Sequence, residues 1–258
     1  MKIRYFSDLH LEFIKPQNIK QFLTQISPGN DEILVLAGDI GNPYHISYDM
    51  FMIYISENFK KTFVIAGNHE YYNMTYNMDE TNIFLNKYFQ KFDNISFLHD
   101  NYEYYLNYCF IGTTLWSKIT NPFNKINDVN CIPNFNYMVC NQLNKNCIEF
   151  LEKTLNNNNN CVVITHHLPS KKLINEKYNT PNMIHYNQWF YSDLDNLIEM
   201  NKDKITCWIY GHTHTISSVK INDIPFLCNP IGYINENENI NFDTNININF
   251  DTNTNINL

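Results

Sequence analysis

Short apolar runs rich in β-branched and aromatic residues alternate with segments of helical period along the first third of the chain. Three of these runs end in a polar cluster and predict buried strands: 2–7, 32–37 and 61–66. The segments between them, 17–27 and 45–59, have the apolar spacing of helices. This order predicts a β-α-β-α-β arrangement and therefore an α/β protein.

The rest of the chain continues this pattern with one irregular stretch. A predicted helix at 79–91 precedes three consecutive predicted strands, which favour a more antiparallel part of the sheet: 95–99, 102–107 and 108–116. Further strands are predicted at 161–167, 205–212, 217–221 and 225–229, with a helix at 187–200. The Asn- and Pro-rich stretch 117–141 lacks a period, so we expect an excursion over the surface near the mouth of a site.

The composition changes near residue 235. The segment 241–248 is followed by a near copy at 249–256, and both consist largely of Asn, Asp, Thr and Ile. Few large apolar groups are present to offset the entropy of ordering, so we expect a folded domain at 1–234 and a disordered tail at 235–258. The alternation of Ile and Asn would also support a strand.

Charge and cysteine content exclude several classes of protein. The formal net charge is -8, and Arg4 is the single arginine, so extended nucleic acid is not an expected partner. The N-terminus lacks the apolar core of a signal peptide and no stretch of about 18 apolar residues follows, which predicts a cytoplasmic protein without membrane association. The seven cysteines form no CxxC pair and suggest neither a thiolate zinc site nor a disulfide framework. The sequence predicts no particular protein partner.

Potential metal ligands follow five of the predicted strands. In an α/β sheet, functional groups gather beyond the carboxyl ends of the strands. The residues at these ends are Asp8 and His10, then Asp39, then Asn68, His69 and Glu70, then His166 and His167, and finally His212 and His214. Six of the nine histidines lie in these clusters, which packing alone does not explain.

The ligand types narrow the choice of metal. Carboxylates, an amide oxygen and imidazoles without a thiolate suit Mn²⁺, Fe or Zn²⁺. Their number exceeds the needs of one tetrahedral ion, so two divalent metal ions are predicted. A shared carboxylate would hold two such ions about 3.5 to 4 Å apart, the separation used for in-line displacement at phosphorus.

Five short motifs, SDLH, GD, GNHE, THH and GHTH, occur in this order at the strand ends. Together they resemble the calcineurin-like metallophosphoesterase superfamily, over roughly residues 1–233. GTTLW at 112–116, Asn127-Asp128 and NPIGY at 229–233 also resemble a bacterial-type branch of it. The resemblance implies a four-layer αββα sandwich of two mixed β-sheets flanked by helices, with a dinuclear metal site.

The resemblance also implies a role for each motif residue. Asp8, His10 and His214 would hold one metal, Asn68, His166 and His212 would hold the second, and Asp39 would bridge the two. A hydroxide between the metals would attack phosphorus. His69 would protonate the leaving oxygen or steady the phosphoryl charge.

Simpler interpretations exist for several of these residues. His69 could instead hold the metal ligand Asn68 in position without taking part in the reaction. Glu70 could support a ligand or cap the following helix. We expect a structural role for His167, because neighbouring residues on an extended chain point in opposite directions. Surface or core roles are expected for the histidines outside the motifs: His45, His99 and His185.

Departures from the family narrow the substrate. Protein phosphatases of the superfamily carry GDxVDRG and an Arg before GNHE, whereas this chain reads GDIGNPY and IAGNHE, and Arg4 lies inside the first strand. Ile231 replaces another Arg that is common in the family. Asn42 replaces the Asp that often pairs with the catalytic histidine, so His69 would be a weaker acid. The missing cations favour a phosphodiester over a dianionic monoester.

The sequence therefore predicts a dinuclear metal-dependent phosphoesterase that acts on a small phosphodiester, such as a cyclic nucleotide or related nucleotide ester. A phosphomonoesterase using the same site is the near alternative. A catalytically silent metal-binding scaffold would be expected to have lost ligands, and a purely structural metal site would keep its coordination closed. A DNA-end nuclease is disfavoured by the short, acidic chain.

Overall fold

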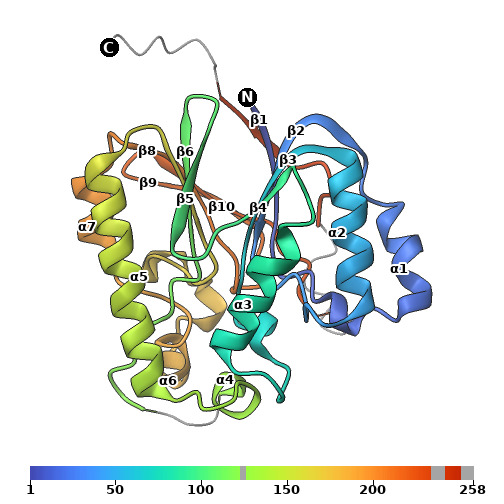
Figure 1. Cartoon of the computed structure of the whole chain (residues 1–258). Coiled ribbons are helices and arrows are strands. Elements are labelled where there is room, and N and C mark those ends of the chain that lie inside the picture. Colours follow the sequence, from blue (N-terminus) through green and yellow to red (C-terminus); the bar gives the residue numbers. More distant parts are fainter. Residues whose placement is uncertain (123–125, 234–241, 251–258) are drawn as a thin grey trace.

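Two mixed β-sheets form the centre of the computed structural model, which describes residues 1–122, 126–233 and 242–250 (Figure 1). The first sheet has the order β11-β1-β2-β3-β4, with β1 (Lys2–Phe6), β2 (Gly29–Ala37), β3 (Phe59–Ile65), β4 (Ile95–Phe97) and β11 (Asn247–Asn249). The second has the order β5-β6-β7-β8-β10-β9, with β5 (Asn101–Tyr105), β6 (Tyr108–Thr113), β7 (Cys161–Thr165), β8 (Ile205–Ile209), β9 (Ser217–Ile221) and β10 (Ile224–Cys228). Strands β5, β9 and β11 are antiparallel to their neighbours and the other pairs are parallel. The predicted α/β class with two mixed sheets flanked by helices is confirmed.

The inner faces of the two sheets share one apolar core. Along β2, the side chains of Ile33, Val35 and Ala37 alternate into this core, as the two-residue period of a strand requires. Phe63 of β3 stacks on Phe110 of β6 with ring centroids 4.1 Å apart, which joins one sheet to the other. The packing holds the carboxyl ends of strands from both sheets in one region of the molecule.

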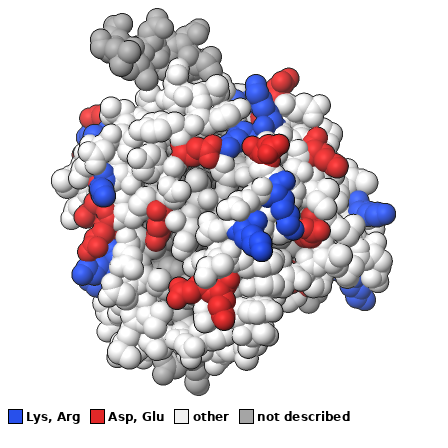
Figure 2. All heavy atoms as spheres, in the orientation of Figure 1, with Lys and Arg blue, Asp and Glu red and all other residues white. Residues whose placement is uncertain are grey.

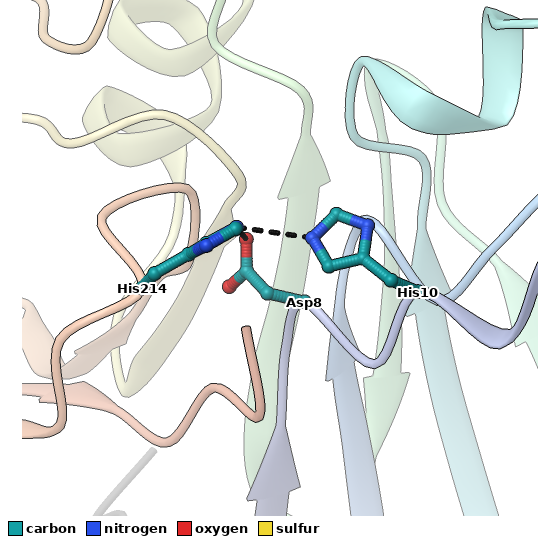
Figure 3. A group of neighbouring side chains, drawn as sticks. All are labelled: Asp8, His10 and His214. Carbon is teal, nitrogen blue, oxygen red and sulfur yellow. Dashed lines mark hydrogen bonds and ion pairs between the residues drawn. The ribbon is translucent and has the colours of Figure 1, made fainter. Parts of the chain in front are cut away.

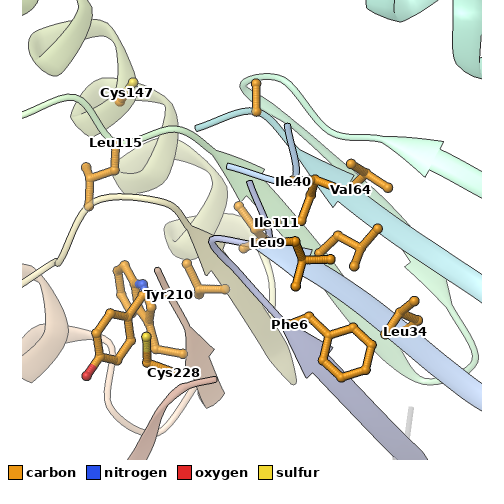
Figure 4. Close-up of a cluster of buried hydrophobic side chains, with 14 of the residues drawn as sticks. Phe6, Leu9, Leu34, Ile40, Val64, Ile111, Leu115, Cys147, Tyr210 and Cys228 are labelled. Atoms are coloured by element: carbon orange, nitrogen blue, oxygen red, sulfur yellow. The ribbon is translucent and has the colours of Figure 1, made fainter. Parts of the chain in front are cut away.

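The outer faces of the sheets pack under helices. Leu34 of β2 lies in this outer core, and Figure 4 shows it beside Phe6 and Val64 of the neighbouring strands. Helix α2 (Ile46–Asn58) buries Phe51 and Ile55 in the same core. Burial of one such side chain contributes about 1.5 to 3 kcal/mol, so the face of each helix is fixed by its apolar positions.

Helices α1 (Pro16–Leu23), α2 and α3 (Met78–Phe89) lie where the sequence predicts them, whereas α7 (Asp195–Met200) covers only the second half of the helix predicted at 187–200. The long helix α5 (Tyr137–Asn157) was not predicted, and it begins inside the expected excursion, which also contains α4 (Asn127–Cys131). Its Asn136 cap accepts hydrogen bonds from the amides of Met138 and Val139. Cysteine and threonine occupy several of its buried positions, so the sequence shows no clear row of large apolar residues at helical spacing.

Part of the expected disordered tail is instead paired with the first sheet. Strand β11 is antiparallel to β1, with Ile3 opposite Ile248, and the ring of Phe242 lies 5.4 Å from that of Phe6. The prediction of disorder is therefore corrected for 242–250, where the alternating isoleucines supply the strand. The other parts of the predicted tail, 234–241 and 251–258, lie outside the described residues.

Charged side chains of both signs are interspersed on the face of the molecule that Figure 2 shows. Arg4 is 3% exposed, and its guanidinium donates to the Glu32 carboxylate and to the carbonyl of Ser27. Arg4 therefore stabilises the first sheet and does not contribute a positive charge to the surface. Within the described part of the chain, no helix is both long and apolar enough to cross a membrane.

Candidate metal centre and catalytic residues

The loops that follow β1, β2, β3, β7 and β8 bring the predicted ligands together at one end of both sheets. In the first cluster, Asp8 and His10 come from the loop after β1 and His214 comes from the loop after β8 (Figure 3). His10 Nε2 lies 3.0 Å from His214 Nε2, which in turn lies 3.5 Å from Asp8 Oδ1. The backbone amide of His212 donates to the Asp8 carboxylate and fixes its position.

The second cluster contains Asp39, His166 and His212, with Asn68 beside them. His166 Nε2 lies 3.3 Å from Asp39 Oδ2, 3.2 Å from His212 Nδ1 and 3.0 Å from Asn68 Oδ1. The other ring nitrogen of His166 lies 2.9 Å from the carbonyl of Ala37, which can only accept, so Nδ1 carries a proton and Nε2 faces the cluster.

These close approaches test whether cations fit the site. Imidazole nitrogens face one another at 3.0 and 3.2 Å beside buried carboxylates, and such converging lone pairs suit a divalent cation. Burial opposes a charge on His166, but the Asp39 carboxylate outweighs it and raises the pKa of His166 to about 10. His166 and His69 in turn hold the pKa of Asp39 well below its usual range, against its burial. The site thus favours positive charge, and its donor set fits two divalent cations.

The local backbone explains why these motifs contain glycine. A Cβ on Gly67 would lie 2.2 Å from Asp39 Oδ1, and a Cβ on Gly38, whose φ is +83°, would lie 2.6 Å from His166 Nδ1. Left-handed backbone is common among the ligands themselves: Asp8, His10, Asp39, His212 and His214 all have positive φ. Such conformations are uncommon for residues other than glycine, although Asp and His adopt them more readily than most, and they concentrate at functional sites.

Glu70 ties the second and third loops together. Its buried carboxylate accepts hydrogen bonds from the amides of Asp39, Ile40 and Gly41 and from that of Gly67. These contacts settle the choice left open by the sequence: Glu70 supports the loop that carries Asp39.

His69 lies between two partners that the sequence analysis missed. Its Nδ1 is 2.9 Å from Glu12 Oε1, and its Nε2 is 3.0 Å from the hydroxyl of Tyr233. Burial opposes the imidazolium, but the Asp39 charge and the Glu12 hydrogen bond raise the pKa of His69 to about 9. The Asn42 side chain instead hydrogen-bonds with the backbone of Tyr72 and Tyr44, so it does not take the place of the carboxylate that often pairs with the histidine in the family. The carboxylate that pairs with His69 comes from Glu12.

Asp128 orients the amide of Asn68. Asn68 Nδ2 donates to Asp128 Oδ1 at 2.9 Å, and the hydroxyl of Tyr72 donates to the same oxygen. The amide oxygen of Asn68 is thereby directed at His166. The sequence pointed to Asn127-Asp128 only through the family resemblance, because nothing local assigns this role.

The remaining histidines lie outside the two clusters. His167 is buried, hydrogen-bonds with the carbonyl of Thr114, and packs its ring 4.2 Å from that of His212. Burial and the neighbouring His166 lower the pKa of His167 to about 3, so it supports His212 as a neutral ring. His45 caps α2, and His185 contacts Asn121 at the surface. His99 stacks beside Phe97.

A pocket of about 350 Å³ opens beside the ligands. Asp39, Asn68, His69, His212 and His214 form one side of it, and its other sides include Asp128 and residues from the segment 168–190. Residues 126–128 belong to the predicted surface excursion, and they line this pocket as expected.

Comparisons with known proteins identify a matching family and similar folds. Residues 1–215 match the family model of calcineurin-like phosphoesterases. The chain is 33% identical to protein L509 of Acanthamoeba polyphaga mimivirus in an alignment 265 residues long. This alignment covers 93% of this chain and 94% of that protein. Its fold is similar to that of a phosphopantetheinyl hydrolase from Mycobacterium tuberculosis, with a TM-score of 0.69 at 14% identity over 90% and 89% of the two chains. It is also similar to the protein TT1561 of Thermus thermophilus, with a TM-score of 0.54 at 11% identity over 89% and 88%.

Proposed function

The chain belongs to the calcineurin-like phosphoesterase family, and from this premise we propose that it hydrolyses a small phosphodiester with the help of two divalent cations. The observation that carries the proposal is the convergence of two ligand clusters and His69 on one side of a single pocket. Such an arrangement of ligands and acid suits the hydrolysis of a phosphate ester.

In the proposed site, Asp8, His10 and His214 hold one cation and Asn68, His166 and His212 hold the other. Asp39 would be shared between the two cations, as the resemblance to the family implies; one of its oxygens adjoins His166 and the other accepts the amide of His69 at 2.8 Å. When bound, the two cations supply an acidified water and neutralise phosphoryl charge. Asp128 and Glu70 keep Asn68 and Asp39 in position through the hydrogen bonds described above.

His69 is the proposed general acid. Its ring lines the pocket, where Nε2 can deliver a proton to the leaving oxygen. The carboxylate of Glu12 on Nδ1 orients the ring and stabilises its charged form. Tyr233 contacts Nε2 from the pocket side and so holds the proton-bearing atom in the open part of the site.

The charge of the pocket supports a diester over a monoester. Among the described residues, the lining contains neither lysine nor arginine, and Arg4 is buried in the first sheet. A monoester dianion would lack the guanidinium contacts that usually balance its second charge. A diester carries a single negative charge, which two cations balance without such contacts.

The test compares bis(p-nitrophenyl) phosphate with p-nitrophenyl phosphate, using protein stripped with chelator and reconstituted with Mn²⁺. We expect metal-dependent turnover that favours the diester. His69→Ala should keep both metals by elemental analysis and lose most turnover, whereas Asp39→Asn should weaken the binding of both metals. His185→Ala, outside the clusters, is the matched control.

Each outcome has a definite meaning. Preference for the monoester would refute the diester assignment and favour a phosphomonoesterase. Full activity in His69→Ala would refute the acid role. Two tightly bound metals without turnover of either ester would favour a catalytically silent scaffold.

A further inference from the structure

Four of the pocket-lining residues that the segment 168–190 contributes are aromatic. Tyr178, Tyr186, Trp189 and Phe190, here called the aromatic wall, all line the pocket. We propose that this wall binds a planar aromatic ring carried by the phosphodiester substrate. The inference rests on the proposed function and specifies the substrate class of the same site.

The aromatic wall is anchored directly to the second ligand cluster. Two residues after His166, the amide of Leu168 donates to the carbonyl of Phe190 at 3.0 Å, and the amide of Ser192 donates back to Leu168 at 2.8 Å. The ring of Phe190 lies 4.6 Å from that of His212. A group bound against the wall would therefore be held at a fixed place beside the phosphate site.

Short helical turns hold the other rings in place. Tyr178 ends the turn Glu176–Tyr178, and Tyr186 lies in α6 (Ile184–Asn187). The side chain of Asn187 donates to the carbonyl of Tyr178 at 2.9 Å and links the two turns. Lys177 extends over the ring of Tyr178, with Nζ 4.6 Å from the centroid, but does not line the pocket.

Two further aromatic rings line the pocket near His69. The ring of Tyr72 stacks on His69 with centroids 4.2 Å apart, and Tyr233 stands beside them. A flat ring could thus enter between aromatic surfaces, where stacking is favourable and tolerant of the identity of the ring.

The chemistry of the lining favours a neutral ring over a second anionic group. No lysine or arginine among the described residues lines the pocket, so a further phosphate would lack a cationic partner. Asn127 and Asn187 offer amide groups, and the indole N–H of Trp189 is buried without a partner in the described structure.

The size of the pocket limits the ligand further. A volume of about 350 Å³ is near the lower end of the range for small-molecule sites, about 300 to 1,000 Å³. One ring with a sugar-sized linker fits this space.

The test uses two diesters with the same leaving group and the same charge: thymidine 5′-(p-nitrophenyl phosphate) and methyl p-nitrophenyl phosphate. In both, water adds to phosphorus and the bond to p-nitrophenolate breaks, so the esters differ only in the retained group. With Mn²⁺-loaded protein, we expect kcat/KM to be at least tenfold higher for the thymidine ester. Tyr186→Ala should lower this ratio toward one, and Tyr102→Ala, a half-exposed tyrosine on β5, should preserve it.

A binding measurement separates this inference from the proposed function. Calorimetric titration of the same protein should show at least tenfold tighter binding of thymidine 5′-monophosphate than of 2-deoxyribose 5-phosphate. If the methyl ester is hydrolysed but both ratios are near one, the ring site is refuted while the phosphoesterase stands. If neither ester is hydrolysed, the proposed function fails, and the calorimetric ratio alone decides whether the wall binds a ring.

Discussion

Replacing the Glu70 carboxylate with an amide tests how the ligand loops are held together. In the wild-type protein, Oε2 accepts the amides of Asp39 and Gly67 at 3.0 and 2.7 Å, and Oε1 accepts that of Ile40 at 2.8 Å and, more weakly, that of Gly41 at 3.4 Å. In Glu70→Gln, one acceptor oxygen becomes an NH₂ group that faces backbone N–H donors. Two buried donors then lose their partner.

The expected loss of stability follows from these contacts. Each buried hydrogen bond to a charged group is worth about 1.5 to 3 kcal/mol, so two lost bonds cost roughly 3 to 6 kcal/mol. The neutral amide is less costly to bury than the carboxylate, which offsets part of this loss. We expect the free energy of unfolding to fall by about 3 kcal/mol, which lowers Tm by about 6 to 12 °C for a chain of this size.

Thermal unfolding in the presence of chelator measures this effect without any contribution from bound metal. Glu152→Gln, on the exposed face of α5, is the matched control and should unfold with wild-type Tm. Calorimetric titration with Mn²⁺ should also show weaker binding in Glu70→Gln, because the loop carrying Asp39 is less firmly held. A Tm within about 2 °C of the wild type would refute the reasoning.

Three further perturbations test other parts of the structure. Glu12→Gln should lower kcat about ten- to hundredfold while elemental analysis still finds both metals, because the charged partner of His69 is lost; an unchanged kcat would contradict the pairing. Adding Mn²⁺ at 100 times its Kd should stabilise the protein by about 2.7 kcal/mol for each site, measured by Tm, with a smaller rise in Asp39→Asn; an equal rise would argue against a shared carboxylate. Truncation after Tyr233 should lower stability by roughly 3 kcal/mol through loss of β11 and the partly buried Phe242, whereas truncation after Phe250 should not; equal Tm values would show that the strand adds nothing.

The sequence predicted the strands and the residues at their ends because both depend on local patterns. An apolar run followed by a polar cluster reports a buried strand and its loop, and parallel strands bring such loops to the same edge. Asp8 and His10 could therefore be placed near His214 across two hundred residues without coordinates, and the structure brings them together.

The partners of His69 depended on tertiary packing and could not be found in this way. Family resemblance directed attention to Asn42, but a turn after β1 places Glu12 against the ring instead. The spacing DLHLE was the available indication, since Glu12 follows His10 at the same two-residue interval that separates Asp8 from His10. Helix α5 escaped prediction for a related reason: cysteine and threonine fill buried positions that leucine usually occupies.

The pairing of β11 with β1 has a consequence for synthesis of the chain. The amino group of Met1 contacts the carbonyl of Phe250 across 249 positions of sequence, so β1 receives its outer neighbour only after all the intervening elements have been made. Until then, one edge of β1 presents unpaired backbone groups that can recruit strands from other molecules. Contacts of such long range also form slowly. The nascent protein therefore passes through an interval in which its ligand loops can assemble while its sheet is still open to aggregation.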